Sequence, residues 1–324
     1  MTSAPDVRTG PHRIDIHHHL MPPKYVAETM SLRAGAGDVS PAWSPERSIE
    51  HMDQHGIATS VTSLMQPQLW FGDVALGRRL ARESNEYAAQ MVRDHPGRFG
   101  MFATFLLLDT EGSLREIEYA LDVLKADGCG LMTSYGNQWL GDPAFWPVLE
   151  ELNRRKAVVY THPLAPACCM NLIPVVREGI IEYATDTTRT IASLLFSGAA
   201  ARFPDIRWIF SHGGGTLPFL LSRFTKEAAI TKEREQRFPK GVMFELKKFY
   251  YDMAQANHAG ALAALLKIVS ASRLLFGSDF PYQSAAETVA GLSEWGFSAA
   301  DLRAIDCGNA LRLMPRLQAS ETSR

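Results

Sequence analysis

The sequence is poor in cysteine, has no long apolar run and carries almost no net charge. Its 324 residues include 4 cysteines, and 33 Lys and Arg nearly balance 35 Asp and Glu. Because the basic residues form no run, we expect neither nucleic acid nor another polyanion as a partner. No segment approaches the ~18 unbroken apolar residues that span a bilayer, and the first residues lack the apolar core of a signal peptide. We therefore expect a soluble protein of the cytoplasm that does not bind membranes.

The spacing of the cysteines argues against two common roles of cysteine, zinc binding in a finger and cross-linking by disulfides. They stand at Cys129, Cys168, Cys169 and Cys307 and form no C-x-x-C pair. A zinc finger or an ordinary disulfide framework needs other spacings, because Cys168 is directly followed by Cys169. We expect reduced thiols.

Motifs for phosphate binding and for serine hydrolysis are also absent. The chain contains neither a G-x-x-x-x-G-K-[ST] phosphate loop nor a G-x-G-x-x-G fingerprint. His212 is followed by three glycines, as in the oxyanion motif of esterases, but the G-x-S-x-G nucleophile elbow that such an enzyme needs is missing. The glycines more simply let the backbone approach a ligand closely.

The sequence does contain a regular alternation of short β-rich runs and longer segments of helical period. Eight such runs lie at 13–20, 58–65, 98–108, 128–135, 157–163, 206–214, 248–254 and 273–281. Helices are expected at 44–56, 74–94, 113–126, 142–156, 187–202, 217–229, 258–270, 285–293 and 298–313. Eight strands, each followed by a helix, predict an α/β protein with a (β/α)8 TIM barrel. We expect a single domain over residues 1–324, with the barrel core in about 13–315 and a disordered polar tail in about 318–324.

Two long stretches interrupt this alternation. Residues 21–43 follow the first strand and contain three prolines, and residues 164–185 follow the fifth strand. Both belong to the C-terminal face of a barrel, where loops build active sites. We interpret them as lid or pocket loops.

Three consecutive histidines lie near the end of the first predicted strand. In a strand, His17 and His19 point to one side and His18 to the other, so the first two can bind one divalent ion together. Taken alone, such a motif is more often a set of core or surface histidines. We expect His18, which faces away, to be structural.

Three other predicted strands end in side chains that bind metals. His162 ends the fifth strand, His212 the sixth and Asp279 the eighth. Because these ends converge at the top of a TIM barrel, we predict one metal site with His17, His19, His162 and Asp279 as ligands. Imidazole and carboxylate donors suit Zn²⁺ best, with Mn²⁺ or Fe²⁺ as substitutes.

His212 has two interpretations. It is either a fifth ligand or an unbound imidazole that carries a proton, for which its ordinary pKa near ~6.5 is suited. We favour the second role, with His212 and Asp279 as the catalytic residues.

Together these motifs resemble those of the amidohydrolase superfamily. H-x-H on the first strand, "HP" on the fifth, "HGGG" on the sixth and "GSDFP" on the eighth are similar to its metal-dependent decarboxylases, typified by aminocarboxymuconate-semialdehyde and 6-methylsalicylate decarboxylases. The similarity covers roughly residues 13–315. It implies an amidohydrolase-like barrel and a homodimer. It also implies one ion, because the fourth strand lacks the lysine that bridges two metals in hydrolytic members.

The resemblance also assigns residues to the substrate. Arg223, eleven residues after His212, resembles an arginine that reaches the substrate in the same or a neighbouring subunit; a solvated helix arginine is the alternative. Trp43 lies in a stretch similar to the family's first loop and would cover the substrate ring, unless it is an ordinary packed tryptophan. A second arginine expected before Trp43 has no clean match, since Arg33 aligns poorly, and this disfavours a dicarboxylate substrate.

Three further residues have weaker assignments. Met65 and Tyr135, at the ends of the second and fourth predicted strands, are candidates for lining the pocket. Asp252, on the seventh, either orients a ligand or caps its strand.

These features predict a non-oxidative decarboxylase of a small aromatic or unsaturated carboxylic acid, such as a salicylate. Asp279, His212 or a metal-bound water would supply the proton, while the ion holds the carboxylate and the adjacent hydroxyl. The nearest alternative is a metal-dependent hydrolase of a lactone, ester or amide, because the same ion can activate water. A hydratase and a non-catalytic metal-binding protein on the same barrel are further alternatives.

Overall fold

The computed structural model describes residues 11–32, 41–64 and 69–318, in which eight parallel strands form one sheet. The strands pair in the order β1-β2-β3-β4-β7-β8-β9-β10. They are β1 (Arg13–Leu20), β2 (Ile57–Leu64), β3 (Phe99–Ala103), β4 (Gly128–Met132), β7 (Val158–His162), β8 (Arg207–Phe210), β9 (Tyr250–Asp252) and β10 (Leu274–Leu275). Each overlaps one of the predicted runs. A small hairpin of β5 (Ser134–Tyr135) and β6 (Gln138–Trp139) follows β4.

The first strand meets the segment that follows the last one, which closes the sheet into a barrel. Ile16 N donates to Phe276 O at 3.1 Å, and Asp279 N donates to His17 O at 2.8 Å. We call this pairing of β1 with residues 276–280 the closing contact. The predicted TIM barrel is therefore confirmed.

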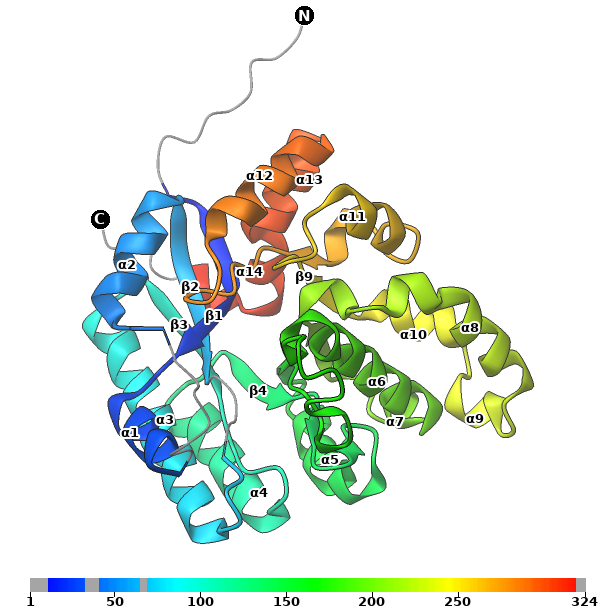
Figure 1. Cartoon of the computed structure of the whole chain (residues 1–324), viewed down its shortest axis with the longest axis horizontal. Helices are drawn as coiled ribbons and strands as arrows, with labels where there is room; N and C mark the ends of the chain where they lie inside the picture. Colours follow the sequence, from blue (N-terminus) through cyan, green and yellow to red (C-terminus); the bar gives the residue numbers. More distant parts are fainter. Residues whose placement is uncertain (1–10, 33–40, 65–68, 319–324) are drawn as a thin grey trace, which may run out of the picture.

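Helices surround the strands on the outside of the barrel (Figure 1). They are α1 (Pro23–Leu32), α2 (Pro45–Gln54), α3 (Val74–Asp94), α4 (Thr110–Glu118), α5 (Trp146–Arg154), α6 (Glu182–Phe196), α7 (Ala199–Arg202), α8 (Leu217–Ile230), α9 (Arg234–Arg237), α10 (Val242–Lys248), α11 (Ala259–Leu265), α12 (Ala285–Trp295), α13 (Ala299–Arg303) and α14 (Asn309–Leu313). Every predicted helix overlaps at least one of them, and the predicted 298–313 helix is divided by a π-helical turn over Ala304–Gly308.

Several helices begin where short polar side chains can cap them. Ser44 Oγ accepts a hydrogen bond from Arg47 N at 3.3 Å, with Pro45 in the first turn of α2. Asp142 Oδ1 accepts from Ala144 N at 2.9 Å, but the turn that it caps, Pro143–Phe145, is a 3₁₀ turn leading into α5. Both capping residues are the first residues of predicted helical segments, 44–56 and 142–156.

One interpreted loop contains a helix. Residues 23–32 of the predicted lid over 21–43 form α1, because Pro23 occupies the first helical position, where a missing N–H costs nothing. Tyr25 of α1 is buried in an apolar cluster that also contains Leu64 and Leu80. Residues 33–40 lie outside the described residues, as do 319–324 of the predicted tail.

A cluster of buried apolar side chains fills the interior of the barrel. Its members come from six strands, from the C-terminal helix α14 and from the residue that follows it: Ile14, Ile16, Val61, Phe102, Val158, Tyr160, Ile209, Leu275, Ala310, Leu313 and Met314. A larger cluster packs the helices against the outer side of the strands. The strands whose C-terminal ends carry polar side chains are therefore held in place by this packed apolar cluster.

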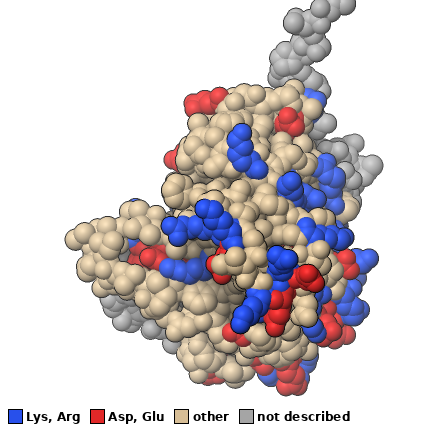
Figure 2. Space-filling view, turned by 90° about the vertical axis from the view of Figure 1, so that its right-hand side faces the viewer, with Lys and Arg blue, Asp and Glu red and all other residues tan. Residues whose placement is uncertain are grey.

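The outer surface mixes charges of both signs. On the face that carries α8 to α10, Lys and Arg side chains are interspersed with Asp and Glu (Figure 2). Among the described residues, none of the helices has the length and apolar character needed to cross a membrane.

Asp15 joins the two sides of the closing contact. Its carboxylate accepts hydrogen bonds from Ser278 N at 2.9 Å and from Ser278 Oγ at 2.5 Å, and from His17 N at 3.1 Å. Asp15 and Ser278 are both buried. Hydrogen bonds to a buried charged group are among the more stabilising kind, so this pair holds the barrel closed.

We expect Ser278→Ala to destabilise the protein by about 1–3 kcal/mol, because the buried Asp15 carboxylate loses a hydroxyl donor. The measurement is the free energy of unfolding from urea denaturation. Ser270→Ala is the matched control, since the Ser270 hydroxyl is exposed and bonds Ser272 Oγ, and it should change stability by less than about 0.5 kcal/mol. Equal effects of the two substitutions would contradict the role given to Asp15.

Candidate metal centre

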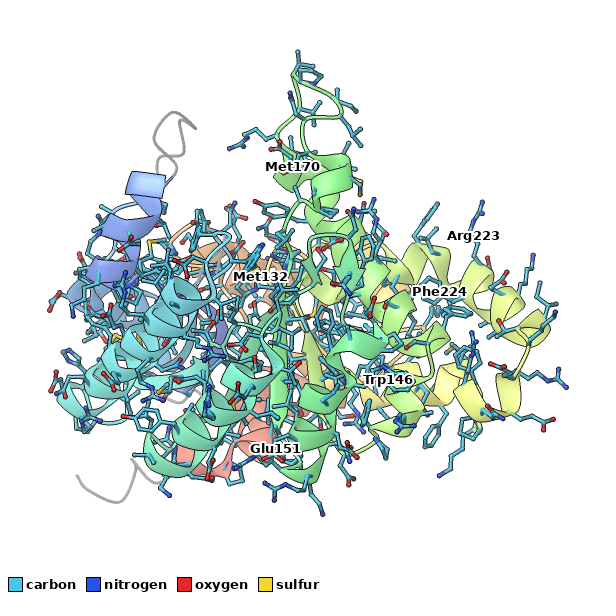
Figure 3. All side chains as sticks on the ribbon, turned by 90° about the horizontal axis from the view of Figure 1, so that it is seen from below. Met132, Trp146, Glu151, Met170, Arg223 and Phe224 are labelled. Atoms are coloured by element: carbon cyan, nitrogen blue, oxygen red, sulfur yellow. The ribbon has the colours of Figure 1, made fainter. Side chains whose placement is uncertain are left out.

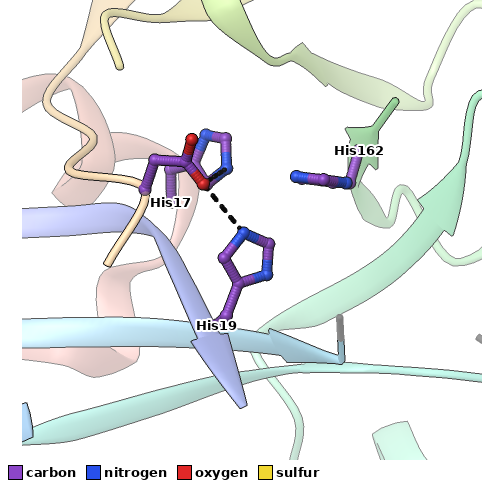
Figure 4. A group of neighbouring side chains, drawn as sticks. His17, His19 and His162 are labelled. Atoms are coloured by element: carbon purple, nitrogen blue, oxygen red, sulfur yellow. Dashed lines mark hydrogen bonds and ion pairs between the residues drawn. The ribbon is translucent and has the colours of Figure 1, made fainter. Parts of the chain in front are cut away.

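The structure brings together the four side chains that the sequence analysis named as ligands. His17, His19, His162 and Asp279 each offer a ligand atom, these atoms all lie within 4.8 Å of one another, and all four residues are buried. The three imidazoles converge from β1 and from the end of β7 (Figure 4). Asp279 belongs to the closing contact, after β10. The four candidate ligands of one ion therefore come from three parts of the barrel: β1, the end of β7 and the segment after β10.

A bulge in β1 determines which histidines face this centre. Asp15 pairs with Ser60 and His18 pairs with Thr62, so β1 advances by three residues over a stretch in which β2 advances by two. Such a bulge turns side chains in new directions. His18 faces away, as expected: its Nε2 lies 3.0 Å from Ser48 Oγ, and its ring stacks on Phe280.

Asp279 contacts most of the neighbouring groups. Its Oδ1 lies 2.9 Å from His19 Nε2 and 3.2 Å from His17 Nε2. Its Oδ2 accepts a hydrogen bond from Gln255 Nε2 and lies 3.6 Å from His212 Nε2. Asp279 has φ 68°, a left-handed conformation that non-glycine residues adopt mainly at functional sites.

Several imidazole nitrogens in this region are buried without a hydrogen-bond partner among the described residues. They are His17 Nε2, His19 Nδ1, His162 Nδ1 and His212 Nε2. Buried polar atoms are almost always paired, because an unpaired one loses its hydration without compensation. A divalent cation accounts for such a group, and three imidazoles with one carboxylate form a donor set that Zn²⁺, Mn²⁺ or Fe²⁺ accepts.

The protonation states follow from burial and from the two neighbouring carboxylates. Burial holds the pKa of His162 well below its usual value, and the adjacent imidazoles lower it further. Burial opposes charge on His17 as well, but Asp252 and Asp279 outweigh it and raise the pKa of His17 to about 10. The pKa of Asp279 is well below the usual value, because His17 outweighs the cost of burial. Neutral His162 and ionised Asp279 are the forms that bind metal, whereas His17, which holds a proton between two carboxylates when no ion is bound, releases that proton when it binds an ion.

Asp252, whose role the sequence left open, lies behind the centre. It is fully buried at the end of β9, and its Oδ2 lies 2.9 Å from His17 Nδ1. Its Oδ1 accepts from the backbone N–H groups of His212 at 3.1 Å and Ala254 at 3.0 Å. A carboxylate on the second nitrogen of a metal-binding histidine fixes the orientation of the ring. Asp252 therefore positions both His17 and His212.

His212 stands beside the four candidate ligands. Its ring centroid lies 5.0 Å from that of His17, and its φ is 52°. The three glycines that follow also have positive φ, and a Cβ at Gly215 would lie 2.0 Å from Ala184 O. Only glycine fits there, so the "HGGG" motif serves the sharp turn that brings His212 to the centre.

Among the described residues, Trp43 and Arg223 make no direct contact with these four side chains. Trp43 is partly buried, packs against the core, and has its ring 6.3 Å from that of Tyr87. Arg223 is exposed on α8, on the side of the molecule where the loop around Met170 projects (Figure 3), and its guanidinium has no ion-pair partner within the described ranges. Tyr135 accepts from Met132 N at 3.1 Å and is a core residue.

Two residues near the centre were missed by the sequence analysis, and one candidate is not described. Gln255, just after β9, bonds Asp279, and the Tyr282 ring lies 5.2 Å from that of His19. Their position a few residues beyond strand ends is the signal that could have found them. Met65 and Arg33 lie outside the described residues.

We expect Asp252→Asn to lower metal affinity by roughly 10–100-fold, because His17 loses the anionic acceptor that orients it. Competition with a chelating dye measures this affinity. Asp205→Asn, at an exposed aspartate, is the control and should leave it unchanged. An Asp252→Asn protein with the affinity of the unaltered protein would show that the contact with His17 is irrelevant to metal binding.

The comparisons with known proteins agree with this geometry. The family described as Amidohydrolase matches residues 14–316. Decarboxylase macB of Penicillium terrestre is 35% identical over 95% of this chain and 96% of its own length, and 6-methylsalicylic acid decarboxylase of Penicillium expansum is 33% identical over 94% and 97%. Among solved structures, 5-carboxyvanillate decarboxylase of Novosphingobium aromaticivorans, complexed with manganese, has a TM-score of 0.86 at 21% identity and covers 94% of this chain and 96% of its own. The chain therefore belongs to the amidohydrolase family and, within it, to the decarboxylase branch.

Proposed function

We propose that this protein catalyses the metal-dependent, non-oxidative decarboxylation of a small aromatic carboxylic acid with a hydroxyl group next to the carboxylate. The observation that carries the proposal is the buried set of three histidines and Asp279, with His212 beside it. Relatives that share about a third of their residues over almost the whole chain are named as decarboxylases, one of them of 6-methylsalicylic acid. The absence of a matching second arginine favours a monocarboxylate.

The proposed ligands of the ion are His17, His19, His162 and Asp279. When bound, the ion acts as a Lewis acid that holds the substrate carboxylate and the neighbouring oxygen. We favour Zn²⁺ because of the three imidazole donors, with Mn²⁺ and Fe²⁺ as substitutes; the 5-carboxyvanillate neighbour contains manganese.

The chain's own residues supply the proton. Loss of carbon dioxide from an aromatic acid requires that the ring carbon first gains a proton, after which the electrons of the broken carbon–carbon bond restore the ring. His212 Nε2 has no hydrogen-bond partner among the described residues and lies 3.6 Å from Asp279 Oδ2, so a proton moves between them through one bridging water or after the two groups approach to hydrogen-bond distance. We assign His212 and Asp279 as the catalytic acid pair, with His212 held by the Asp252 contact to its backbone.

The remaining assignments concern the substrate and a second subunit. We propose that Trp43 covers the substrate ring and that the protein is a homodimer in which Arg223 enters the neighbouring subunit's site. The exposure of Arg223 on α8 supports this, because the side chain is accessible to a neighbouring subunit. Phe219, on the same helix, is 88% exposed, as expected of an interface residue. Cys129, Cys168 and Cys169 are free thiols, which supports a reducing compartment such as the cytoplasm.

We expect the purified protein to release carbon dioxide from at least one substituted salicylate and His212→Asn to lower that turnover by about 10²–10⁴-fold without loss of bound metal. Carbon dioxide release and metal content are measured on the same samples. His258→Asn is the matched control, because His258 is exposed and caps α11, a role that asparagine also fills. Hydrolysis of lactones or esters with no carbon dioxide from any aromatic acid would identify a hydrolase instead.

Mixing two inactive variants tests the role of Arg223. We expect His162→Asn and Arg223→Ala each to be inactive alone and a mixture, after subunit exchange, to regain activity. In the mixed dimer, the subunit with an intact metal site receives Arg223 from its neighbour. A mixture as inactive as its components would place Arg223 in its own subunit or outside catalysis.

A further inference from the structure

We propose that Cys168 and Cys169 form a reversible redox site, in which hydrogen peroxide joins their two sulfurs in a disulfide between adjacent residues. The proposal does not depend on the substrate or on the proposed function. It concerns the loop between His162 and α6, which the catalytic assignment leaves unused.

The two thiols are already in contact. Their Sγ atoms lie 2.7 Å apart within the 3₁₀ turn Ala167–Cys169, and both cysteines are free. Cys168 is exposed, whereas Cys169 is 9% exposed. An oxidant therefore reaches Cys168 first, and Cys169 is in place to react with the product.

A cation stands next to the inner thiol. Arg189 Nη2 donates to Cys169 Sγ at 3.5 Å. The hydrogen bond with Cys168 raises the pKa of the Cys169 thiol, and Arg189 opposes that rise. A neighbouring guanidinium favours the thiolate, which is the form that attacks an oxidised sulfur.

The reaction balances with one molecule of peroxide. The Cys168 thiolate attacks one peroxide oxygen, the O–O bond breaks, and a sulfenic acid forms while the other oxygen leaves as water. Cys169 then attacks the Cys168 sulfur and displaces a second water. The two thiols have lost two protons and two electrons, and the peroxide has been reduced to two waters.

The disulfide formed here is easily reduced. Adjacent Cα atoms across a trans peptide are about 3.8 Å apart, whereas disulfides usually join Cα atoms about 4.4–6.8 Å apart. A bridge outside its preferred geometry is strained and has a more oxidising potential. Such a bond suits a switch better than a structural cross-link.

Hydrogen bonds connect this site to the metal centre. Arg189 lies 3.7 Å from Asp186, whose carboxylate accepts from Thr133 Oγ1 at 2.5 Å and from Trp139 Nε1 at 2.7 Å. Thr133 N in turn donates to the carbonyl oxygen of His162 at 2.9 Å. Because ring closure must move Cys169 relative to Arg189, we expect it to disturb the loop that follows His162 and to lower turnover.

The experiment oxidises the whole protein with hydrogen peroxide, alkylates the remaining thiols and maps them by peptide mass spectrometry. We expect the wild type to lose two alkylatable thiols, at Cys168 and Cys169, and its mass to fall by two hydrogen atoms, with full recovery after dithiothreitol. Turnover of the best acid of the salicylate panel should fall several-fold and recover in parallel. Cys168→Ser and Cys169→Ser should each abolish the paired loss, and Cys307→Ser, at a partly exposed cysteine outside the loop, should retain it.

Three outcomes would overturn the proposal. They are two thiols that stay alkylatable after peroxide, sulfinic acid at Cys168 in place of the disulfide, and a disulfide between chains on a non-reducing gel. A disulfide at the predicted pair with no change in turnover would refute the connection to the metal centre. The mass measurement is independent of substrate, so a failure of the proposed function remains distinguishable.

Discussion

The closing contact between β1 and residues 276–280 is the constraint on which the rest of the structure depends. It unites the last strand with the first through Asp15 and Ser278, and the same few residues carry His17, His19 and Asp279. Buried charges are tolerated only when their partners are in place. The register in which the barrel closes is therefore also the register that places Asp279 beside the histidines.

Strained backbone surrounds the same centre. His212, Gln255 and Asp279 all have positive φ, at 52°, 55° and 68°. Each such residue costs free energy that other contacts must offset. The buried Asp252 contributes part of this compensation, because it binds the backbone N–H of His212 and the ring of His17. The candidate catalytic groups are thus held in place before any substrate binds.

Much of the fold could be predicted because parallel barrel strands are buried on both faces and appear as short apolar runs. All eight runs overlap a strand, including "RIDIHHHL", whose histidines interrupt the apolar pattern. The helix α1 was interpreted as a loop because Pro22 and Pro23 dominate its start. Burial of Tyr25 in the cluster with Leu64 and Leu80, which no local pattern reveals, favours the helix there.

The sequence by itself determined which strand ends carry metal-binding side chains, because a residue's position along a strand fixes its height in the barrel. His17, His19, His162 and Asp279 could be grouped on that basis alone. Only the tertiary structure decided what lies around them: Asp252 behind His17, Gln255 on Asp279, and Arg223 exposed on α8. These contacts depend on how loops and helices pack around the barrel. Packing between segments that are far apart in the sequence produces no periodic pattern of residues, so the sequence alone does not reveal it.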